Sequence, residues 1–142
     1  MSNYTIIRKH EIHTGHRVYG HLGKCQNLHG HSYIIHFHCT ATKLNELGMV
    51  IDFSIIKNTL CQWLDDNYDH RMLIWQEDPI AHSLKAIDTT VTLVPYNPTA
   101  ENIANYLLNT IAPEILTKNY PDIMITQVLI EETGKCSASA FL

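Results

Sequence analysis

The sequence predicts an α+β domain in which two helices pack on one face of a largely antiparallel sheet. Two N-terminal segments are rich in β-branched and aromatic residues, as strands are. Two later segments repeat apolar residues at helical spacing behind a capping residue. A further segment near the C-terminus is apolar at nearly every position, which is typical of a strand covered on both faces.

The two N-terminal strands are separated by a loop. Residues 3–13, NYTIIRKHEIH, have the composition and spacing of a first strand that ends near Gly15. Residues 16–30 are rich in glycine and contain Lys24 and Asn27, which is loop composition. Residues 31–42, HSYIIHFHCTAT, then predict the second strand.

The first helix is expected over about residues 53–66. A turn around Gly48 precedes it, and Asp52 stands where an N-cap residue belongs. Its helically spaced apolar residues are Phe53, Ile56, Leu60 and Trp63.

The second helix opens in NPTAEN, residues 97–102, with Pro98 before it and Thr99 as its cap. Pro113 is expected to end or kink this helix. Its apolar stripe consists of Ile103, Ala104, Leu107, Leu108 and Ile111.

The remaining segments complete the order β-β-α-(β)-α-β-(β). Residues 66–73, DNYDHRML, are expected to form a loop, and residues 76–90 are weakly patterned and expected to be irregular. The three remaining strands are expected in VTLVPY (91–96), DIMITQVLIEET (122–133) and, as a final edge strand, CSASAFL (136–142).

Length and composition indicate one globular domain spanning residues 1–142. Hydrophobic residues make up 45% and charged residues 17%, which argues against disorder. Ten Lys and Arg against fourteen Asp and Glu give a formal charge of −4, so no general attraction to nucleic acid or to an anionic membrane is expected. An anionic ligand must therefore be met by a local cluster of basic groups.

The expected location is the cytoplasm. No segment resembles a signal peptide or a membrane span, because the apolar stretches are short and interrupted. Without an export signal, the cysteines are expected to be reduced thiols and not a disulfide framework. They are Cys25, Cys39, Cys61 and Cys136.

The chain has ten histidines, and eight of them precede residue 39. Two pairs have the i, i+2 spacing that points side chains the same way along a strand: His29 with His31, and His36 with His38. The strand period places these pairs on opposite faces. Phe37, between the second pair, is a core residue, so His36 and His38 are interpreted as ordinary strand histidines. Gly30, between the first pair, allows a close backbone approach.

His29 and His31 need a third partner to bind a metal, and the spacing leaves two candidates open. Cys25 would give a Cys-His-His set that suits a closed structural zinc once a fourth ligand joins. His16 would instead give three neutral imidazoles with an open fourth position, the arrangement of catalytic zinc. In that case Cys25 stays free beside the metal and Lys24, where its thiolate is favoured as a base or nucleophile.

Two carboxylate-bearing motifs are further candidates. Asp69 directly precedes His70, a pairing in which a carboxylate can orient an imidazole for proton transfer. An isolated Asp-His dipeptide is more often a cap or a loop hydrogen bond. LIEET places Glu131 and Glu132 at the end of an apolar strand, where a carboxylate is available to a ligand with adjacent N–H donors. Periodicity alone does not choose between the two glutamates.

Six ordered motifs together resemble the 6-pyruvoyl tetrahydropterin synthase and 6-carboxytetrahydropterin synthase family. The match is collinear from about residue 4 to residue 134. The motifs are HR (16–17), KC…LHGH (24–31), GMVIDF (48–53), DHR (69–71), NPTAEN (97–102) and EET (131–133). The resemblance implies a tunnelling fold, an antiparallel sheet with two helices on one face, assembled as trimers that stack into homohexamers.

The resemblance also implies the roles of individual residues. His16, His29 and His31 become the Zn²⁺ ligands, and Cys25 becomes the general base. Asp69 with His70 forms a proton relay, and Glu132 anchors the amino and ring N–H groups of the pterin. The substrate that it implies is 7,8-dihydroneopterin triphosphate, bound between subunits, so that Cys25 and His70 can come from different chains.

The short Cys-x-x-x-His-x-His spacing resembles the bacterial 6-carboxytetrahydropterin synthases of queuosine precursor synthesis, which release acetaldehyde and triphosphate. Pyruvoyl-forming activity on the same substrate is the close alternative, and a non-catalytic structural-zinc module is the alternative from another class. Arg17, Lys24 and Arg71 lie beside His16, Cys25 and His70, and offer a local positive charge for a triphosphate.

Overall fold

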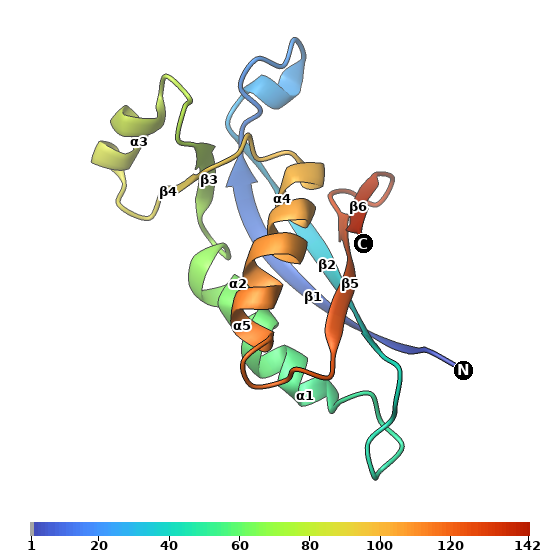
Figure 1. The fold of residues 1–142 in the computed structure, drawn as a ribbon. Helices are drawn as coiled ribbons and strands as arrows, with labels where there is room; N and C mark the ends of the chain where they lie inside the picture. Colours follow the sequence, from blue (N-terminus) through green and yellow to red (C-terminus); the bar gives the residue numbers. More distant parts are fainter. Residues whose placement is uncertain (1) are drawn as a thin grey trace.

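The computed structural model describes residues 2–142, whose strands form one six-stranded sheet (Figure 1). The order of strands across the sheet is β4-β3-β1-β2-β5-β6. The strands are β1 (Tyr4–His16), β2 (His29–Ala41), β3 (Met72–Trp75), β4 (Thr92–Val94), β5 (Met124–Glu131) and β6 (Ser137–Phe141).

The sheet is mixed, which corrects the fully antiparallel sheet implied by the resemblance. β1, β2, β5 and β6 pair in antiparallel fashion, as the sequence predicts. β3 runs parallel to both β1 and β4. β3 touches β1 through only two residue pairs, Gly15 with Met72 and His16 with Leu73, so most of the outer edge of β1 has no strand beside it.

Two long helical segments cover one face of the sheet, and each contains a π-helical turn. The first runs through α1 (Phe53–Ile56), the turn η2 (Lys57–Cys61) and α2 (Gln62–Asn67). The second runs through α4 (Ala100–Tyr106), the turn η3 (Leu107–Ile111) and α5 (Ala112–Leu116).

Both predicted N-caps are confirmed. The Asp52 carboxylate accepts a hydrogen bond from the Ser54 N–H at 2.8 Å, and the Thr99 hydroxyl accepts from the Asn102 N–H at 3.1 Å. Each cap satisfies an N–H that has no partner within the first turn of its helix.

The second helical segment does not end at Pro113 but continues to Leu116. In the π turn before it, the N–H of Ala112 reaches back to the carbonyl of Leu107. Pro113 therefore lies inside a continuous helical segment, directly after its π turn.

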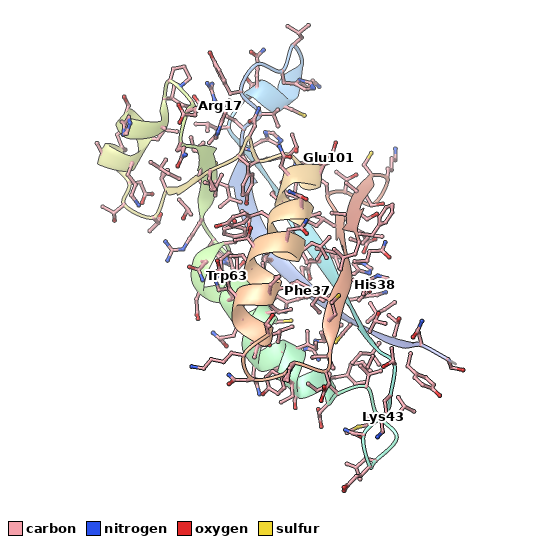
Figure 2. All side chains as sticks on the ribbon, in the orientation of Figure 1. Arg17, Phe37, His38, Lys43, Trp63 and Glu101 are labelled. Carbon is pink, nitrogen blue, oxygen red and sulfur yellow. The ribbon has the colours of Figure 1, made fainter. Side chains whose placement is uncertain are left out.

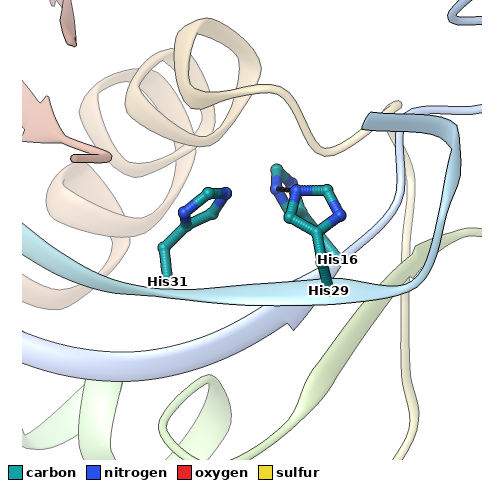
Figure 3. Close-up of side chains that lie close together, drawn as sticks. All are labelled: His16, His29 and His31. Atoms are coloured by element: carbon teal, nitrogen blue, oxygen red, sulfur yellow. Dashed lines mark hydrogen bonds between the residues drawn. The ribbon is translucent and has the colours of Figure 1, made fainter. Parts of the chain in front are cut away.

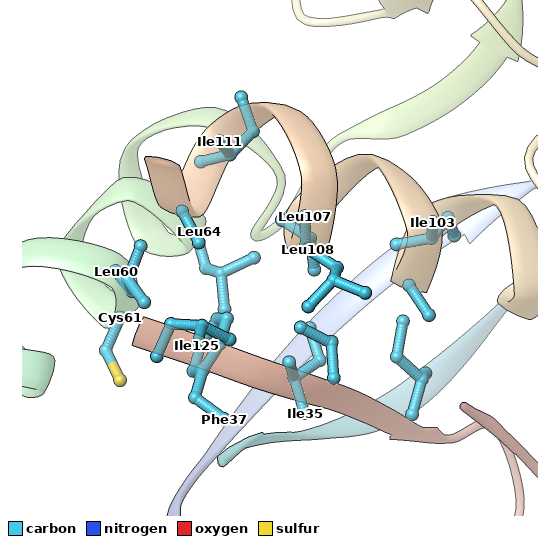
Figure 4. Packing of buried hydrophobic residues seen from close by; sticks show 14 of the residues in the cluster. Ile35, Phe37, Leu60, Cys61, Leu64, Ile103, Leu107, Leu108, Ile111 and Ile125 are labelled. Carbon is cyan, nitrogen blue, oxygen red and sulfur yellow. The ribbon is translucent and has the colours of Figure 1, made fainter. Parts of the chain in front are cut away.

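The core lies between the sheet and the two helical segments (Figure 4). Tyr33, Ile35 and Phe37 point from β2 into this core, while the residues between them face the other side of the sheet. Phe37 and His38 are labelled in Figure 2 and leave β2 on opposite faces. The period of two read from the sequence is thus the period of burial, and it fixes which histidines face the helices.

Two elements were absent from the sequence prediction. Residues 72–75, placed there in or after a loop, form β3, and the segment expected to be irregular contains the helix α3 (Ala81–Ile87). Both are short, and they share a small separate core of Ile74, Ala81 and Val91. Four strand residues and seven helical ones are too few to show a clear period.

No helix within residues 2–142 is long and apolar enough to cross a membrane.

Replacing Leu64 with alanine tests the packing of the first helical segment on the sheet. The Leu64 side chain is fully buried, so Leu64→Ala is expected to lower the free energy of unfolding by about 2–5 kcal/mol. Urea unfolding followed by circular dichroism measures this loss. Leu47→Ala is the matched control, because Leu47 is 80% exposed; equal losses in the two variants would contradict the observed packing.

Candidate functional site

Three histidines meet where β1 ends and β2 begins (Figure 3). His16 is the last residue of β1 and is paired in register with His29, the first residue of β2. His31 lies two residues further on and therefore points to the same face. One nitrogen from each ring lies within 4.8 Å of the others, so the two strands alone bring the three imidazoles together.

Gly30 permits this arrangement. It is paired with Gly15 across the two strands. A Cβ atom at residue 30 would lie 3.2 Å from the Thr14 carbonyl oxygen, which is backbone and cannot move aside cheaply. The expectation that Gly30 allows a close backbone approach is therefore confirmed.

Hydrogen bonds fix which nitrogen of His16 and His29 carries the proton. Nδ1 of His16 lies 2.6 Å from the Pro98 carbonyl oxygen, and Nδ1 of His29 lies 2.7 Å from the Asn27 carbonyl oxygen. A carbonyl oxygen only accepts, so both Nδ1 atoms donate, and in the neutral rings both Nε2 atoms present lone pairs. These two Nε2 atoms lie only 3.1 Å apart.

The third imidazole and a carboxylate complete the cluster. Nε2 of His31 is buried and has no hydrogen-bond partner among the described residues. Oε1 of Glu132 lies 3.4 Å from Nε2 of His16 and 3.3 Å from Nε2 of His31. Converging lone pairs and a carboxylate repel one another unless a cation lies between them, so the donor set fits a metal ion.

Burial favours the form of the imidazoles that binds a metal. Desolvation is the largest influence on His16 and lowers its pKa, even though the hydrogen bond to Pro98 and the Glu132 carboxylate act in the other direction. Burial likewise lowers the pKa of His31, against the opposing effect of Glu132. Neutral imidazole is the ligand form, so His16, His29 and His31 could hold a metal near neutral pH.

Cys25 does not belong to this ligand group. It lies in the 3₁₀ turn η1 (Lys24–Gln26), within the loop that joins β1 to β2, and is half-buried. Its carbonyl oxygen accepts a hydrogen bond of 2.7 Å from the Val18 N–H, which ties the turn to the start of the loop. Of the two candidates for the third ligand, the structure brings His16, and not Cys25, to His29 and His31.

Asp69 and His70 form a contact pair in the bend before β3. Nδ1 of His70 lies 2.9 Å from the Asp69 carboxylate, whose other oxygen accepts a hydrogen bond from the His13 N–H at 2.8 Å. Burial alone would raise the pKa of Asp69, but these two hydrogen bonds outweigh it and lower the pKa. His70 has a positive φ of 59°, uncommon outside glycine, and its side chain is 76% exposed.

The Asp69–His70 pair and the histidine triad lie on opposite faces of the sheet. The triad is on the helix-covered face with Tyr33, whose ring packs edge-on against His16 and His31. His70 is on the uncovered face, with its ring centroid 5.8 Å from that of His13. Strand alternation therefore places the two groups on opposite faces within one chain. A cavity of about 530 Å³ beside His70 is lined by residues of β1 and β2, His31 among them.

The structure separates the two glutamates as well. Glu131 turns to the uncovered face, where its carboxylate lies 2.6 Å from Nε2 of His36. Glu132 is the glutamate beside the triad. β5 ends at Glu131, and Glu132 is the first residue after it. Of the two glutamates between which periodicity could not choose, Glu132 is thus the one near the histidines.

Arg17 does not offer a free positive charge at the site. Its guanidinium makes two hydrogen bonds to the buried carboxylate of Asp78, at 2.6 and 2.7 Å. From sequence, Arg17 was expected to join Lys24 and Arg71 as a counter-charge for an anion, and its partner was not identified. An isolated aspartate in a weakly patterned segment, such as Asp78, carries no signal of its partner.

Backbone groups are the other contributors that were missed. The carbonyl oxygens of Pro98 and Asn27 orient two of the imidazoles. Side-chain patterns do not report backbone acceptors, and the sequence marked Pro98 only as the start of a helix.

Metal titration tests the triad. His31→Ala is expected to weaken Co²⁺ binding by more than about 100-fold. Loss of a residue that only hydrogen-bonds to a metal ligand costs up to about 100-fold, so a larger loss identifies His31 as a ligand itself. Visible absorption of Co²⁺ follows the titration. His36→Ala is the matched control, because His36 lies on the same strand but faces away from the triad; an equal loss of affinity in that variant would contradict the assignment.

Comparison with known proteins extends over nearly the whole chain. The family model described as 6-pyruvoyl tetrahydropterin synthase matches residues 5–141. A Rickettsia felis protein named 6-carboxy-5,6,7,8-tetrahydropterin synthase is 37% identical over 131 residues, which cover 91% of this chain and 94% of the relative. A Haemophilus influenzae protein of the same name is 33% identical over 113 residues, covering 75% of this chain and 80% of the relative.

Solved structures share the fold. A Wolinella succinogenes protein superposes with a TM-score of 0.86 at 22% identity, covering 99% of each chain. The 6-pyruvoyl tetrahydropterin synthase of Caenorhabditis elegans superposes with a TM-score of 0.70 at 24% identity, covering 100% of this chain and 97% of the other. Together with a family match from residue 5 to residue 141, these findings show that the chain belongs to the 6-pyruvoyl tetrahydropterin synthase family.

Proposed function

We propose that this chain is a zinc-dependent 6-carboxy-5,6,7,8-tetrahydropterin synthase. It would convert 7,8-dihydroneopterin triphosphate and one water molecule to 6-carboxy-5,6,7,8-tetrahydropterin, acetaldehyde and triphosphate, on the route to queuosine and related 7-deazapurines. The observation that carries the proposal is the convergence of His16, His29 and His31 with Glu132 beside them. The relatives above 30% identity bear this synthase name.

His16, His29 and His31 would hold the Zn²⁺ ion as three neutral imidazole ligands. When bound, the ion supplies Lewis-acid chemistry, polarising an oxygen of the substrate side chain and so acidifying the adjacent C–H. The carbonyl oxygens of Pro98 and Asn27 would keep two of the rings in the tautomer that the metal requires.

Cys25 would be the general base that removes the proton from the substrate side chain. Its position supports this role, because it lies in the loop between His16 and His29 but outside the ligand group. The Glu132 carboxylate would accept hydrogen bonds from the amino and ring N–H groups of the pterin, a bidentate task that suits two oxygens.

Asp69 and His70 would relay protons to the site of another subunit in a homohexamer. The separation of His70 from the triad by the sheet supports this assignment, because a proton relay has to come within hydrogen-bond reach of its substrate. The exposure of the His70 side chain fits a group that is completed by a neighbouring chain.

Formation of 6-pyruvoyl tetrahydropterin from the same substrate is the second candidate. It is favoured by the structural likeness to the Caenorhabditis elegans enzyme of that name. The short spacing from Cys25 to His29 and the names of the more similar relatives favour the carboxy product instead.

Product analysis of the metal-loaded protein tests the proposal. Incubation with 7,8-dihydroneopterin triphosphate is expected to yield acetaldehyde, triphosphate and 6-carboxy-5,6,7,8-tetrahydropterin, identified by mass. Cys25→Ala is expected to lower turnover by at least about 100-fold, the scale of lost general-base catalysis, with the zinc content unchanged. A pyruvoyl product would select the second candidate, and loss of zinc from Cys25→Ala would show that Cys25 is a ligand and not the base.

Mixing two inactive variants tests whether sites are shared between subunits. The oligomers of the two variants, Cys25→Ala and His70→Ala, are dissociated into single chains, mixed in equal amounts and reassembled. If each site takes Cys25 and His70 from different chains, about a quarter of the sites regain both residues, and activity returns in that proportion. If both residues serve the same chain, every site lacks one of them, and the mixture stays as inactive as its components.

A further inference from the structure

Residues 76–91 include none of the residues proposed to act in the reaction, but Asp78 links them to the segment that follows His16. Asp78 is only 3% exposed and accepts two hydrogen bonds from Arg17, from Nε at 2.6 Å and from the terminal nitrogen at 2.7 Å. A parallel pair of this kind fixes the direction of the guanidinium as well as its distance. Figure 2 shows Arg17 between the loop that follows β1 and the α3 region.

Arg17 is placed where its restraint acts on the site. It directly follows His16, and the next residue, Val18, donates the hydrogen bond to the Cys25 carbonyl. The following residue, Tyr19, exchanges two hydrogen bonds with the Asn97 side chain, at 3.2 and 2.9 Å. The stem of the Cys25 loop is therefore held from two sides, by Asp78 and by Asn97.

We propose that Asp78 is a positioning residue that holds the Cys25 loop in place through Arg17. Residues 76–91 would thereby contribute to the reaction. The proposal deepens the proposed function, and only its prediction for kcat and KM rests on that function. Asp78 does not touch the triad; it acts through the stem of the loop that carries the thiol.

The pair can be broken without breaking α3. Oδ1 of Asp78 also accepts a hydrogen bond from the Ile80 N–H at 3.0 Å, just before the helix. Asparagine supplies the same oxygen for such a bond, so Asp78→Asn removes the charge that holds Arg17 and keeps the helix start. Arg17, already partly exposed, is free to turn to solvent.

The test compares the alkylation of two cysteines in the same metal-loaded sample. Iodoacetamide labelling of Cys25 is measured by mass spectrometry relative to Cys136, which is exposed and lies far along the chain between β5 and β6. In Asp78→Asn, the Cys25 to Cys136 ratio is expected to rise at least about threefold, and kcat to fall about tenfold with KM changed less than about twofold. Glu77→Gln, which removes an exposed carboxylate from the same turn, is expected to leave both quantities unchanged.

A double variant separates positioning from packing. Arg17→Met with Asp78→Leu replaces the buried pair by apolar side chains, an exchange that often restores or improves stability. The double variant is expected to have the melting temperature of the wild-type protein. Its labelling ratio and its low kcat are expected to stay those of Asp78→Asn. Recovery of all three would overturn the proposal and leave the pair a packing element. Wild-type labelling and kcat in Asp78→Asn would overturn it too, and normal labelling with no turnover in wild-type protein would instead count against the proposed function.

Discussion

The pairing of β1 with β2 is the constraint on which the rest of the site depends. Its register sets His16 opposite His29 and places His31 one period later on the same face. A slip of one residue would turn His29, His31 and Tyr33 to the uncovered face. The same register is therefore required for the core and for the metal-binding group. Gly15 and Gly30 face each other in this ladder. The tight backbone contact there is the geometric condition for three imidazoles to meet.

Within that frame, the charges and lone pairs leave the site in need of a cation. The Pro98 and Asn27 carbonyls occupy the Nδ1 donors of two rings, and burial keeps His16 and His31 neutral. What then converges is the lone pairs of His16 and His29, with His31 and the Glu132 carboxylate beside them. An arrangement of this kind costs free energy in the empty protein and is favourable once a divalent ion is bound, which couples metal affinity to the folded structure. The paired strands and the backbone carbonyls of Pro98 and Asn27 supply this preorganisation.

The parts of the structure that could be predicted from sequence are those with a local physical signal. The alternation in residues 31–42 predicted which side of β2 is buried, and Asp52 and Thr99 marked their helices because a cap acts on its own first turn. The i, i+2 spacing of His29 and His31 is also a local signal, and it predicted two members of the triad. Spacing left His16 and Cys25 as equal candidates for the third ligand, and the register of β1 with β2 decides for His16. β3, α3 and the Arg17–Asp78 pair were not predictable, because each is defined by partners distant in sequence. The backbone acceptors that orient the rings leave no trace in side-chain patterns at all.

The sheet also separates the histidine triad from the Asp69–His70 pair. Under the proposed function, this separation is the reason why one chain is an incomplete enzyme. Side chains of successive residues leave a strand on opposite faces, so a residue on the uncovered face reaches the triad only around an edge. Asp69 and His70 are held on the uncovered face by the His13 N–H and by a bend that requires an uncommon backbone conformation at His70. Such a conformation persists only where the surrounding structure imposes it. The pair is thus fixed on the face opposite the triad of its own chain, beside a cavity that leaves His70 accessible. Under the proposed function, this strand geometry is what favours a site shared between subunits, with neither chain rearranged.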